Sequence, residues 1–551
     1  MSEVRNDGHW IAVGTAFVTV CTAIWLSKVS EIVPEPYLDE VFHLRQAQVY
    51  CNGDFHIWDQ KITTPPGLYL VSWLIFKITG HCSITALRSL NLGTLLIAPY
   101  LTYSILLNLS PEPASSTKTR WSALSAANIW LFPPVFFFSG LYYTDVQSAL
   151  WVLLSFQAYL RYEKDGFQSF SEAISLIRFG LIALCFRQTN VFWVAVFPAG
   201  LGIVSSLRQS AQKATQVDNV GFWEMCEASW YESALYDPRV EAAWIQDYMK
   251  TIVSIVIVAL GNPSKLVRPL VPCIFLLAAF GGFVLWNGGV VLGDKSNHVA
   301  TIHMPQMLYL WPYLVFFSIP VLLPPLVISA MDVFSHPPSA GSMFRQISMF
   351  TASTILAAGV IHYNTIIHPF TLADNRHYVF YVFRILLRHP AIRYVAAPAY
   401  IFCANLAIQA LGGTKLISKV LKQNSDQKSF TGRPVPGNSA SFVMIWLVTT
   451  ALSLVTAPLV EPRYCIIPWM MWRLHLPRLV ESTHLPRLVE STSETESTKS
   501  SGLLGVWEDD GTRLICETIW FCCINAMTGY IFLYWGFSWP QEEGKVQRFM
   551  W

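Results

Sequence analysis

The chain is poor in charged residues, which make up only 13% of its 551 positions. Soluble globular domains carry about 25%. Hydrophobic residues account for 53% of the sequence, and its mean hydropathy is +0.40. The formal net charge is only +2 and no basic stripe is present, so we expect no nucleic-acid partner. The apolar surplus instead indicates a protein of the lipid bilayer.

Several chemical signatures are also missing. The 11 cysteines include no CxxC pair at zinc-ligand spacing. The sequence has no GxxxxGK[ST] phosphate loop and no GxGxxG fingerprint. It also lacks a DxD motif, which argues against a nucleotide-sugar site that holds manganese. We therefore predict neither a bound metal nor a cofactor.

What the sequence does contain is a succession of apolar runs. We count roughly thirteen, the first at 11–29 and the last at 514–537. A helix needs about 20 apolar residues to cross a bilayer. The first run lacks a basic leader and an A-x-A cleavage site, so we interpret it as a retained helix. The pattern predicts an all-α polytopic protein with roughly 12–14 transmembrane helices in one membrane domain, 1–551.

Two apolar segments, 67–80 and 378–388, are too short to span and are predicted to lie along the membrane interface. Basic loops at 413–438 and 473–513 mark the cytosolic side. We place with them the N-terminus, 108–120, 161–172 and a cytosolic loop at 207–250. The opposite, non-cytosolic side then receives 30–83, 187–190, 288–306, 364–393, 459–463 and the C-terminal tail. The arginines of 376–393 violate the charge bias, which suggests that they bind something anionic.

Residues 475–492 consist of "HLPRLVEST" repeated once in tandem, followed by Ser/Thr/Glu-rich sequence to Ser501. Two copies are too few for a solenoid, which needs at least three longer units. We predict that 475–512 is a low-complexity cytosolic loop that tolerates expansion.

Two adjacent carboxylates, Asp39 and Glu40, follow the first apolar run. A carboxylate beside a low-dielectric region has a tunable pKa and can act as a general base. Asp39 and His43 are four residues apart and share a face if the segment is helical. Alternatively, the acids lie at a helix N-terminus and complement its macrodipole. Composition leaves both interpretations open.

Other ionisable residues lie near the membrane. Asp145 and Arg187 follow tight connections at membrane depth, where such groups are functional or paired with each other. A structural Asp145–Arg187 ion pair is therefore the alternative to a functional role. Arg376, His377 and Arg463 can hold a phosphate through charge-assisted contacts. Snorkelling at the interface is the alternative for these cations.

The remaining candidates are weaker. Trp58 and Tyr69 present aromatic faces of the kind that sugars and lipid headgroups contact, although an aromatic belt would use them equally. His298 and His303 are five residues apart, a spacing that suits neither a helical nor a strand-based metal pair.

Eight blocks of the sequence together resemble, in order, the eukaryotic dolichyl-phosphate-glucose-dependent α-1,2-glucosyltransferase family of the endoplasmic reticulum. They are "EPYLDEVFHLRQAQVYC", "WDQKITTPPGLY", "LYYTD", "FRQTN", "DKSNHVATIHMPQMLY", "HPFTLADNRHY", "EPRYCIIP" and "QRFMW". The resemblance runs from about residue 10 to 551. The sequence departs from the family at Asp145, where a glutamate is usual, and in the duplicated 475–492 segment.

The resemblance implies a GT-C fold in which the first lumenal loop, 30–83, holds the catalytic acid and membrane-parallel helices. It implies an enzyme of the endoplasmic reticulum membrane with a lumenal active site. Its donor would be dolichyl phosphate glucose, and its acceptor the terminal glucose of the Glc2Man9GlcNAc2 lipid-linked oligosaccharide. A β-linked donor that yields an α-1,2 product requires inversion by single displacement. Within the same fold the alternative is a different dolichyl-phosphate-sugar transferase, and outside it a polytopic transporter or scramblase.

The resemblance also suggests roles for individual residues. Asp39 is the predicted base, with Glu40 second. The donor phosphate is assigned first to Arg376 and then to His377, Arg463 and Arg187. Further substrate contacts are predicted for Trp58, Asp59, Tyr69, Asp145, His303, Asp374 and Asn375. Whether Cys51 and Cys82 pair in the oxidising lumen is left open.

Overall fold

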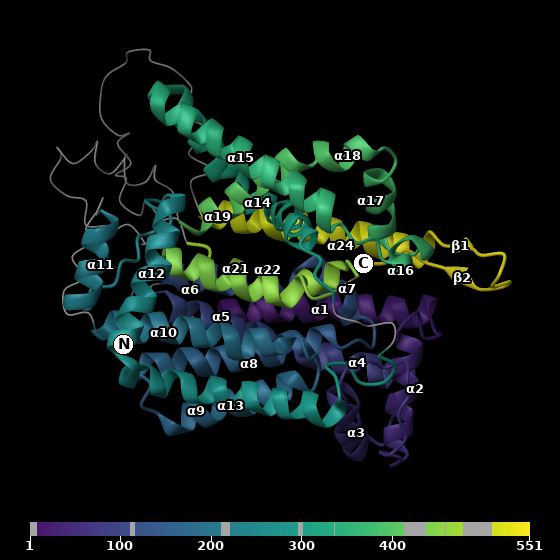
Figure 1. Cartoon of the computed structure of the whole chain (residues 1–551). Helices are drawn as coiled ribbons and strands as arrows, with labels where there is room; N and C mark the ends of the chain where they lie inside the picture. The colour runs from purple at the N-terminus through teal and green to yellow at the C-terminus, as the bar shows by residue number, and fades with distance from the viewer. Residues whose placement is uncertain are drawn as a thin grey trace, which may run out of the picture.

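The computed structural model describes residues 8–110, 116–210, 221–295, 301–335, 337–412, 437–457, 459–477 and 510–551. The predicted loops 413–438 and 475–512, and His298, fall wholly or largely outside these ranges. The described chain is predominantly helical (Figure 1). Its elements are α1 (Gly8–Ile32), α2 (Glu40–Cys51), α3 (Gly67–Thr79), α4 (Ile84–Leu95), α5 (Ala98–Leu109), α6 (Ser116–Leu131), α7 (Pro133–Ser139), α8 (Asp145–Lys164), α9 (Phe170–Leu184), the π-helix η2 (Phe192–Val196), α10 (Phe197–Ser210), α11 (Phe222–Tyr231), α12 (Ile245–Gly261), α13 (Pro263–Asn287), α14 (Pro305–Ser335), α15 (Ala340–Asn364), α16 (Pro369–Ala373), α17 (Tyr378–Leu386), α18 (Pro390–Val395), α19 (Ala397–Leu411), α21 (Ala440–Leu454), the 3₁₀ turn η3 (Pro462–Cys465), α22 (Ile466–Leu474), α24 (Asp510–Tyr534), β1 (Phe537–Ser538) and β2 (Val546–Gln547).

In the described chain, seven helices are long and apolar enough to cross a membrane, or eight if the bent pair α6–α7 counts as one span. The predicted all-α, multi-pass membrane class is confirmed. The count is lower than the predicted 12–14 because several helices of the bundle are shorter or more polar than a lipid-exposed span. For example, α21 has only 15 residues, and α8 carries buried glutamines at Gln147 and Gln157. Such helices are shielded from lipid by their neighbours.

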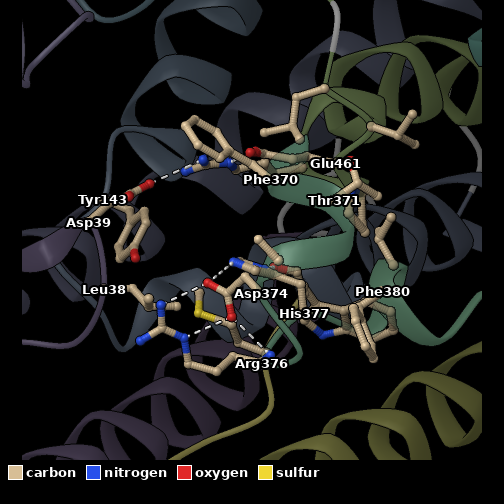
Figure 2. A pocket seen from close by; sticks show the side chains of 18 of the residues that line it. Leu38, Asp39, Tyr143, Phe370, Thr371, Asp374, Arg376, His377, Phe380 and Glu461 are labelled. Atoms are coloured by element: carbon tan, nitrogen blue, oxygen red, sulfur yellow. Dashed lines mark hydrogen bonds and ion pairs between the residues drawn. The ribbon is translucent and has the colours of Figure 1, made fainter. Parts of the chain in front are cut away.

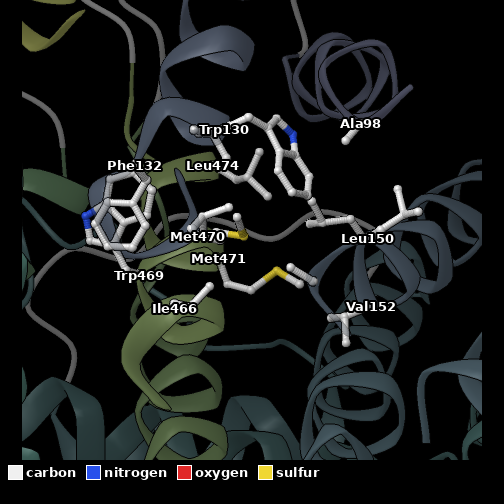
Figure 3. Packing of buried hydrophobic residues seen from close by; sticks show 14 of the residues in the cluster. Ala98, Trp130, Phe132, Leu150, Val152, Ile466, Trp469, Met470, Met471 and Leu474 are labelled. Carbon is white, nitrogen blue, oxygen red and sulfur yellow. The ribbon is translucent and has the colours of Figure 1, made fainter. Parts of the chain in front are cut away.

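The core of the bundle is rich in aromatic side chains. The rings of Phe132 and Trp469 stack with their centroids 3.7 Å apart (Figure 3). Residues from both ends of the chain, including Ile11 and Met550, belong to the same buried cluster. The first apolar run, α1, is part of this cluster, and its retention in the protein stays a prediction.

A buried ion pair joins three helices of the bundle. Arg473 of α22 donates to Glu517 of α24 at 2.8 and 2.6 Å, and Asn128 of α6 donates to the same carboxylate at 2.9 Å. All three side chains are almost completely buried. Charges at membrane depth are tolerated only when they are paired in this way, so the network holds α6, α22 and α24 in register.

One end of the bundle collects the segments that we predicted to share the lumenal side. Figure 1 shows α2, α3, α16, α17 and the β1–β2 hairpin at this end, whereas the N-terminus and α11 lie at the other. Gln188 donates to the Thr63 carbonyl at 2.6 Å, and the Asp294 backbone donates to the Gln60 carbonyl at 2.7 Å. Segments 30–83, 187–190 and 288–306 therefore meet, as the charge pattern predicted.

The first loop is closed by a disulfide and anchored by a glycine. Cys51, at the end of α2, is bonded to Cys82, just before α4, which settles a question that the sequence left open. Gly67 donates its backbone N–H to the Cys185 carbonyl at 2.8 Å, and a Cβ at Gly67 would lie 2.5 Å from that oxygen. Only glycine allows α3 to begin this close to the end of α9.

The two helices predicted to be interfacial are short, as expected. α3 packs against α2 and exposes apolar side chains on its other side, including Leu74 and Ile78. α17 likewise exposes Val382 and Ile385. Helices that are too short to span and have an apolar outer face are suited to the membrane interface.

Candidate functional site

A cavity of about 380 Å³ opens at the end of the bundle where the first loop lies (Figure 2). Its walls come from segments that are far apart in the sequence. They are Leu38 and Asp39 before α2, Phe138 and Tyr143 near α7, residues between Phe370 and Phe380, residues 459–463, Trp539, Met550 and Trp551. Five of the predicted site residues line it, namely Asp39, Asp374, Arg376, His377 and Arg463.

Asp39 and Arg463 form an ion pair on one wall. Arg463 Nη2 lies 3.1 Å from Asp39 Oδ2, and Nε of the same guanidinium bonds to Glu461. Arg463 is largely buried, whereas the Asp39 side chain is half-exposed. Enclosure by the protein opposes ionisation, but the Arg463 guanidinium outweighs it and lowers the pKa of Asp39 below its usual value. Asp39 is therefore a carboxylate at neutral pH.

The turn before α2 directs Asp39 toward the cavity. Leu38 has φ 54°, a left-handed conformation that costs a non-glycine residue roughly 1–2 kcal/mol. The turn is held by two hydrogen bonds between Tyr37 and Glu40: the Tyr37 backbone donates to Glu40 Oε2 at 3.1 Å, and the Glu40 backbone donates to the Tyr37 carbonyl at 3.2 Å. Asp39 occupies the N-cap position of α2 but makes no side-chain cap bond. A capping hydrogen bond therefore does not account for this carboxylate, although it does lie at the helix N-terminus, as the macrodipole alternative requires.

Glu40, the second predicted catalytic residue, points into the protein. Its side chain is completely buried and accepts bonds from Arg88 Nε at 2.7 Å and Arg88 Nη2 at 2.6 Å. The backbone N–H of Tyr142 donates to the same carboxylate at 2.8 Å. Arg88 also donates to the Val33 carbonyl at 2.8 Å. Glu40 therefore ties α2 and α4 to the end of α1 and does not line the cavity.

The opposite wall carries a second ion pair. Arg376 donates to Asp374 through Nε at 2.8 Å and Nη2 at 2.7 Å, and its Nη1 donates to Gln547 at 3.1 Å. Its guanidinium lies 4.6 Å from the centroid of the Trp539 ring. Burial opposes ionisation of Asp374, but its hydrogen bonds from Arg376 lower its pKa below the usual value. The guanidinium of Arg376 is therefore already engaged on several sides.

The C-terminal residues complete this wall. Met550 donates its backbone N–H to the Arg376 carbonyl at 2.9 Å and accepts from the Tyr378 N–H at 3.1 Å. His377 lines the cavity between these bonds, with Nδ1 3.2 Å from the Trp551 carbonyl and Nε2 3.8 Å from the Asp374 carboxylate. The tail thus pairs with the backbone on either side of His377.

Asp145 and Arg187 form an ion pair of 2.9 Å, the alternative that the sequence left open. Arg187 also donates to Thr144 at 3.2 Å. Neither side chain lines the cavity, but the Arg187 guanidinium lies 5.9 Å from the ring of Tyr464, the neighbour of Arg463. The pair therefore lies outside the cavity, next to the segment that carries Arg463.

Three residues predicted to contact substrate lie elsewhere in the first loop, Trp58 and Tyr69 in its small core and Asp59 beside it. Tyr69 is fully buried, and its hydroxyl lies 2.6 Å from His43 Nδ1. The Trp58 ring packs 5.8 Å from the Tyr69 ring, and the Asp59 carboxylate accepts from the Lys61 backbone at 3.0 Å. The structure does not bring Trp58, Asp59 or Tyr69 to the cavity, because these side chains hold the loop together.

His43 shares the predicted helical face with Asp39 but is not a free cation. Burial lowers the pKa of His43 to about 4, in spite of the opposing field of Asp39. His43 is therefore neutral at physiological pH, and its bond to Tyr69 fixes the ring behind Asp39.

Two further residues predicted to contact substrate, His303 and Asn375, lie at different distances from the cavity. His303 is completely buried and does not line the cavity. Asn375 accepts a 3.0 Å bond from the Trp539 indole and so positions a side chain of the cavity wall. Within the described ranges, no three His, Cys, Asp or Glu side chains gather as a metal site.

Several lining residues were not among the predicted ones, including Glu461, Trp539, Tyr143 and Trp551. Glu461, Tyr143 and Trp551 lie in blocks that the family resemblance had already marked. The sequence did not show what these side chains would do at the site. For example, Glu461 is relevant because it is the second carboxylate bonded to Arg463, a contact that only the structure shows. Trp539 lies outside every block, and no sequence signal singled it out.

Comparison with known proteins agrees with the resemblance. Residues 33–474 match the family model described as the DIE2/ALG10 family. A relative from Aspergillus fumigatus named Dol-P-Glc:Glc(2)Man(9)GlcNAc(2)-PP-Dol alpha-1,2-glucosyltransferase is 41% identical over 97% of both chains. A relative of the same name from Homo sapiens is 31% identical over 99% of both chains. Among solved structures, the Archaeoglobus fulgidus oligosaccharyltransferase aligns with a TM-score of 0.26 at 12% identity, over 85% of this chain and 56% of that one. By the extent of the family match and the identity to these relatives, the chain belongs to the DIE2/ALG10 family.

Proposed function

We propose that this protein transfers glucose from dolichyl phosphate glucose to the terminal glucose of Glc2Man9GlcNAc2-PP-dolichol, forming an α-1,2 linkage. Family membership and the names of relatives that match nearly the whole chain support this reaction. The observation that carries the assignment to a site is Asp39. It is an ionised, half-exposed carboxylate in a cavity that also holds Arg463, Arg376 and His377.

In the proposed mechanism Asp39 is the general base. It accepts the proton of the acceptor 2-hydroxyl while that oxygen attacks C1 of the donor glucose. The bond from C1 to the phosphate oxygen breaks, and dolichyl phosphate leaves with the bond electrons. Single displacement inverts the anomeric centre, as a β-linked donor and an α product require. Glu40 is less suited to this role because four hydrogen bonds occupy its buried carboxylate.

Phosphate binding is proposed for the cations of the cavity. Negative charge builds up on the leaving phosphate, and fixed cations stabilise it. Arg463, Arg376 and His377 all line the cavity and are all assigned to the phosphate. Both arginines are already engaged by carboxylates, Arg376 by Asp374 and Arg463 by Asp39 and Glu461, so these contacts do not rank one arginine above the other. Arg187 is paired with Asp145 and lies outside the lining, so it acts on the site at longer range.

The proposed location is the membrane of the endoplasmic reticulum, with the cavity on the lumenal side and the GT-C fold implied by the family. The disulfide in the first loop supports an oxidising compartment on that side. The donor lipid would lie among the helices, and the oligosaccharide would approach from the aqueous side.

The test uses purified full-length protein in lipid nanodiscs with synthetic dolichyl phosphate glucose and a Glc2Man9GlcNAc2 lipid acceptor. We expect a product larger by one hexose, and sensitivity of the new linkage to an α-1,2-specific glucosidase. Asp39→Asn should reduce the rate at least about a hundredfold, the usual contribution of a general base. Asp54→Asn removes another carboxylate of the same loop and should leave the rate unchanged.

Two results would refute the proposal. Transfer from dolichyl phosphate mannose instead would make this a different transferase of the same fold. Full activity of Asp39→Asn with the correct donor would leave the reaction in place and remove the proposed base.

A further inference from the structure

A second cleft, of polar lining, lies between α5 and α8, outside the cavity described above. Its residues are Ser104 and Asn108 on α5, Gln157, Arg161 and Lys164 on α8, and Asp165. We call it the α5–α8 cleft. Ser104 and Asn108 are four residues apart, and the three α8 residues follow at intervals of four and three. This spacing places each set on one helix face, so the two faces line the cleft together.

The α5–α8 cleft lies at the opposite end of the bundle from the cavity. α8 begins at Asp145, two residues after the cavity-lining Tyr143, and ends at Lys164 after 20 residues. At about 1.5 Å per residue it spans about 30 Å, which matches the hydrocarbon thickness of a bilayer. The cleft therefore faces the leaflet opposite the one at the cavity. The sequence predicted this side to be cytosolic from its basic loops.

The base of the cleft contains an unsatisfied polar group. Gln157 is only 4% exposed, and its Nε2 donates to Ser104 Oγ at 2.9 Å. Its Oε1 is buried and accepts no hydrogen bond from the described residues. A buried amide oxygen without a donor is unfavourable, so a bound hydroxyl group at this point would be stabilising.

The rim of the cleft carries two cations. Arg161 and Lys164 are exposed, and within the described ranges neither side chain is in an ion pair. Asp165 is the one acid of the lining. Two adjacent cations suit a phosphodiester, while Asp165, Asn108 and Gln157 Oε1 suit neighbouring hydroxyl groups.

An apolar track leads from the cleft toward the middle of the bilayer. Ile97 directly precedes α5, and Tyr100, Ser104 and Asn108 follow it along the helix at intervals of three and four. Ile97 is 56% exposed and Tyr100 is 45% exposed. The stripe thus changes from apolar to polar toward the cleft, in the order of an acyl chain followed by its headgroup.

We propose that the α5–α8 cleft binds an anionic phospholipid with a polyol headgroup, such as phosphatidylinositol, from the leaflet opposite the catalytic cavity. Arg161 and Lys164 hold the phosphodiester. Gln157 accepts from a headgroup hydroxyl. The acyl chains lie along Ile97 and Tyr100. This site takes no part in glucose transfer.

The test is a titration of full-length protein in mild detergent with dioctanoyl phosphatidylinositol, read as a one-to-one adduct by native mass spectrometry. Dioctanoyl phosphatidylcholine, which lacks both the net charge and the polyol, should bind far more weakly. Arg161→Gln/Lys164→Gln should weaken phosphatidylinositol binding by about tenfold or more, because both charge-assisted bonds to the phosphodiester are lost. Gln157→Leu should weaken phosphatidylinositol binding but leave dioctanoyl phosphatidic acid binding unchanged.

A matched control is available at the same end of the bundle. Lys265 and Arg268 are exposed in the first turns of α13, and the Arg268 carbonyl accepts from Tyr162 of α8. Lys265→Gln/Arg268→Gln removes the same charge and should leave binding unchanged. Thermal unfolding without lipid checks that each variant is folded, and the single variants Arg161→Gln and Lys164→Gln replace the double one if it is not.

Three results would overturn the proposal. The first is equal loss of binding in the cleft variant and the α13 control, which would indicate a general effect of charge. The second is binding of phosphatidylcholine as tight as that of phosphatidylinositol. The third is displacement of phosphatidylinositol by inorganic phosphate at a similar concentration, which would make this a free-anion site.

Discussion

Arg463 Nη2 lies 3.1 Å from Asp39 Oδ2, although 424 positions separate the two residues in the sequence. Glu461 bonds to the same guanidinium. One cation is therefore shared by the proposed base and a second carboxylate. Since a donor phosphate would be a third anion at this guanidinium, the pairing links donor binding to the proton affinity of Asp39.

The first prediction concerns pH dependence. Arg463 lowers the pKa of Asp39, so removal of the cation should raise it. The base is active only when deprotonated, and Arg463→Gln should therefore lose activity at a higher pH as the solution is acidified. We expect the acidic limb of kcat/KM to move upward by about one to three pH units, the effect of one nearby arginine. An acidic limb that stays in place, or moves downward, would show that Asp39 is not the titrating base.

The second prediction separates two roles of Arg376. Arg376→Ala leaves the Asp374 carboxylate uncompensated on the cavity wall, so it should repel the donor phosphate and raise the donor KM about tenfold or more. Asp374→Ala/Arg376→Ala removes both charges and should recover much of the loss. Steady-state kinetics with varied donor measures both. If the double variant is as impaired as the single one, Arg376 contacts the donor directly.

The third prediction concerns Glu40 and its buried partner Arg88. Glu40→Ala leaves the Arg88 guanidinium buried without its counter-ion and should destabilise the protein by about 3–5 kcal/mol. Glu35→Ala removes an exposed carboxylate five residues earlier and should change stability by less than about 0.5 kcal/mol. Denaturant unfolding in detergent measures both. Near-normal stability of Glu40→Ala together with lost transfer would instead assign Glu40 to catalysis.

The fourth prediction concerns the disulfide of the first loop. Cys51 and Cys82 are 31 positions apart, and closing a loop of that length stabilises a protein by about 3–4 kcal/mol in the chain-entropy account. Cys51→Ser, Cys82→Ser and the double variant should be destabilised equally, because each removes the same bond. Cys523→Ser, at an exposed free cysteine, is the control. Reducing agent should lower the melting temperature of the unmodified protein and leave that of the double variant unchanged.

Some of the fold could be predicted because the bilayer constrains it. An apolar run of 67–80 is too short to cross hydrocarbon, so a non-spanning helix was predictable from length alone, and α3 has that character. The number of spans was harder to predict, because α8 keeps the polar side chain of Gln147 away from lipid by burying it among other helices. Hydropathy cannot distinguish a shielded helix from a lipid-exposed one before the neighbours are known.

The candidate site was likewise predictable only in part. Segment blocks and charge bias indicated which residues share one end of the bundle. They did not indicate that Trp58 and Tyr69 would pack the core of the first loop, or that Asp59 would bond to the loop's own backbone. Nor did they indicate that Arg376 would be bonded to Asp374, two residues away, because a short turn can direct neighbouring side chains toward each other or apart.

By itself the sequence determined the membrane class, the shared end of the polar segments and the presence of two carboxylates there. The reason is that segments in lipid must be apolar, whereas segments in water can be polar and charged. Only the tertiary structure decided what each carboxylate faces. Successive residues at the start of a helix point about 100° apart, so Asp39 and Glu40 cannot face the same surroundings. Glu40 meets Arg88 in the core, and Asp39 meets Arg463 at the cavity. That difference depends on partners 48 and 424 positions away, which no local pattern encodes.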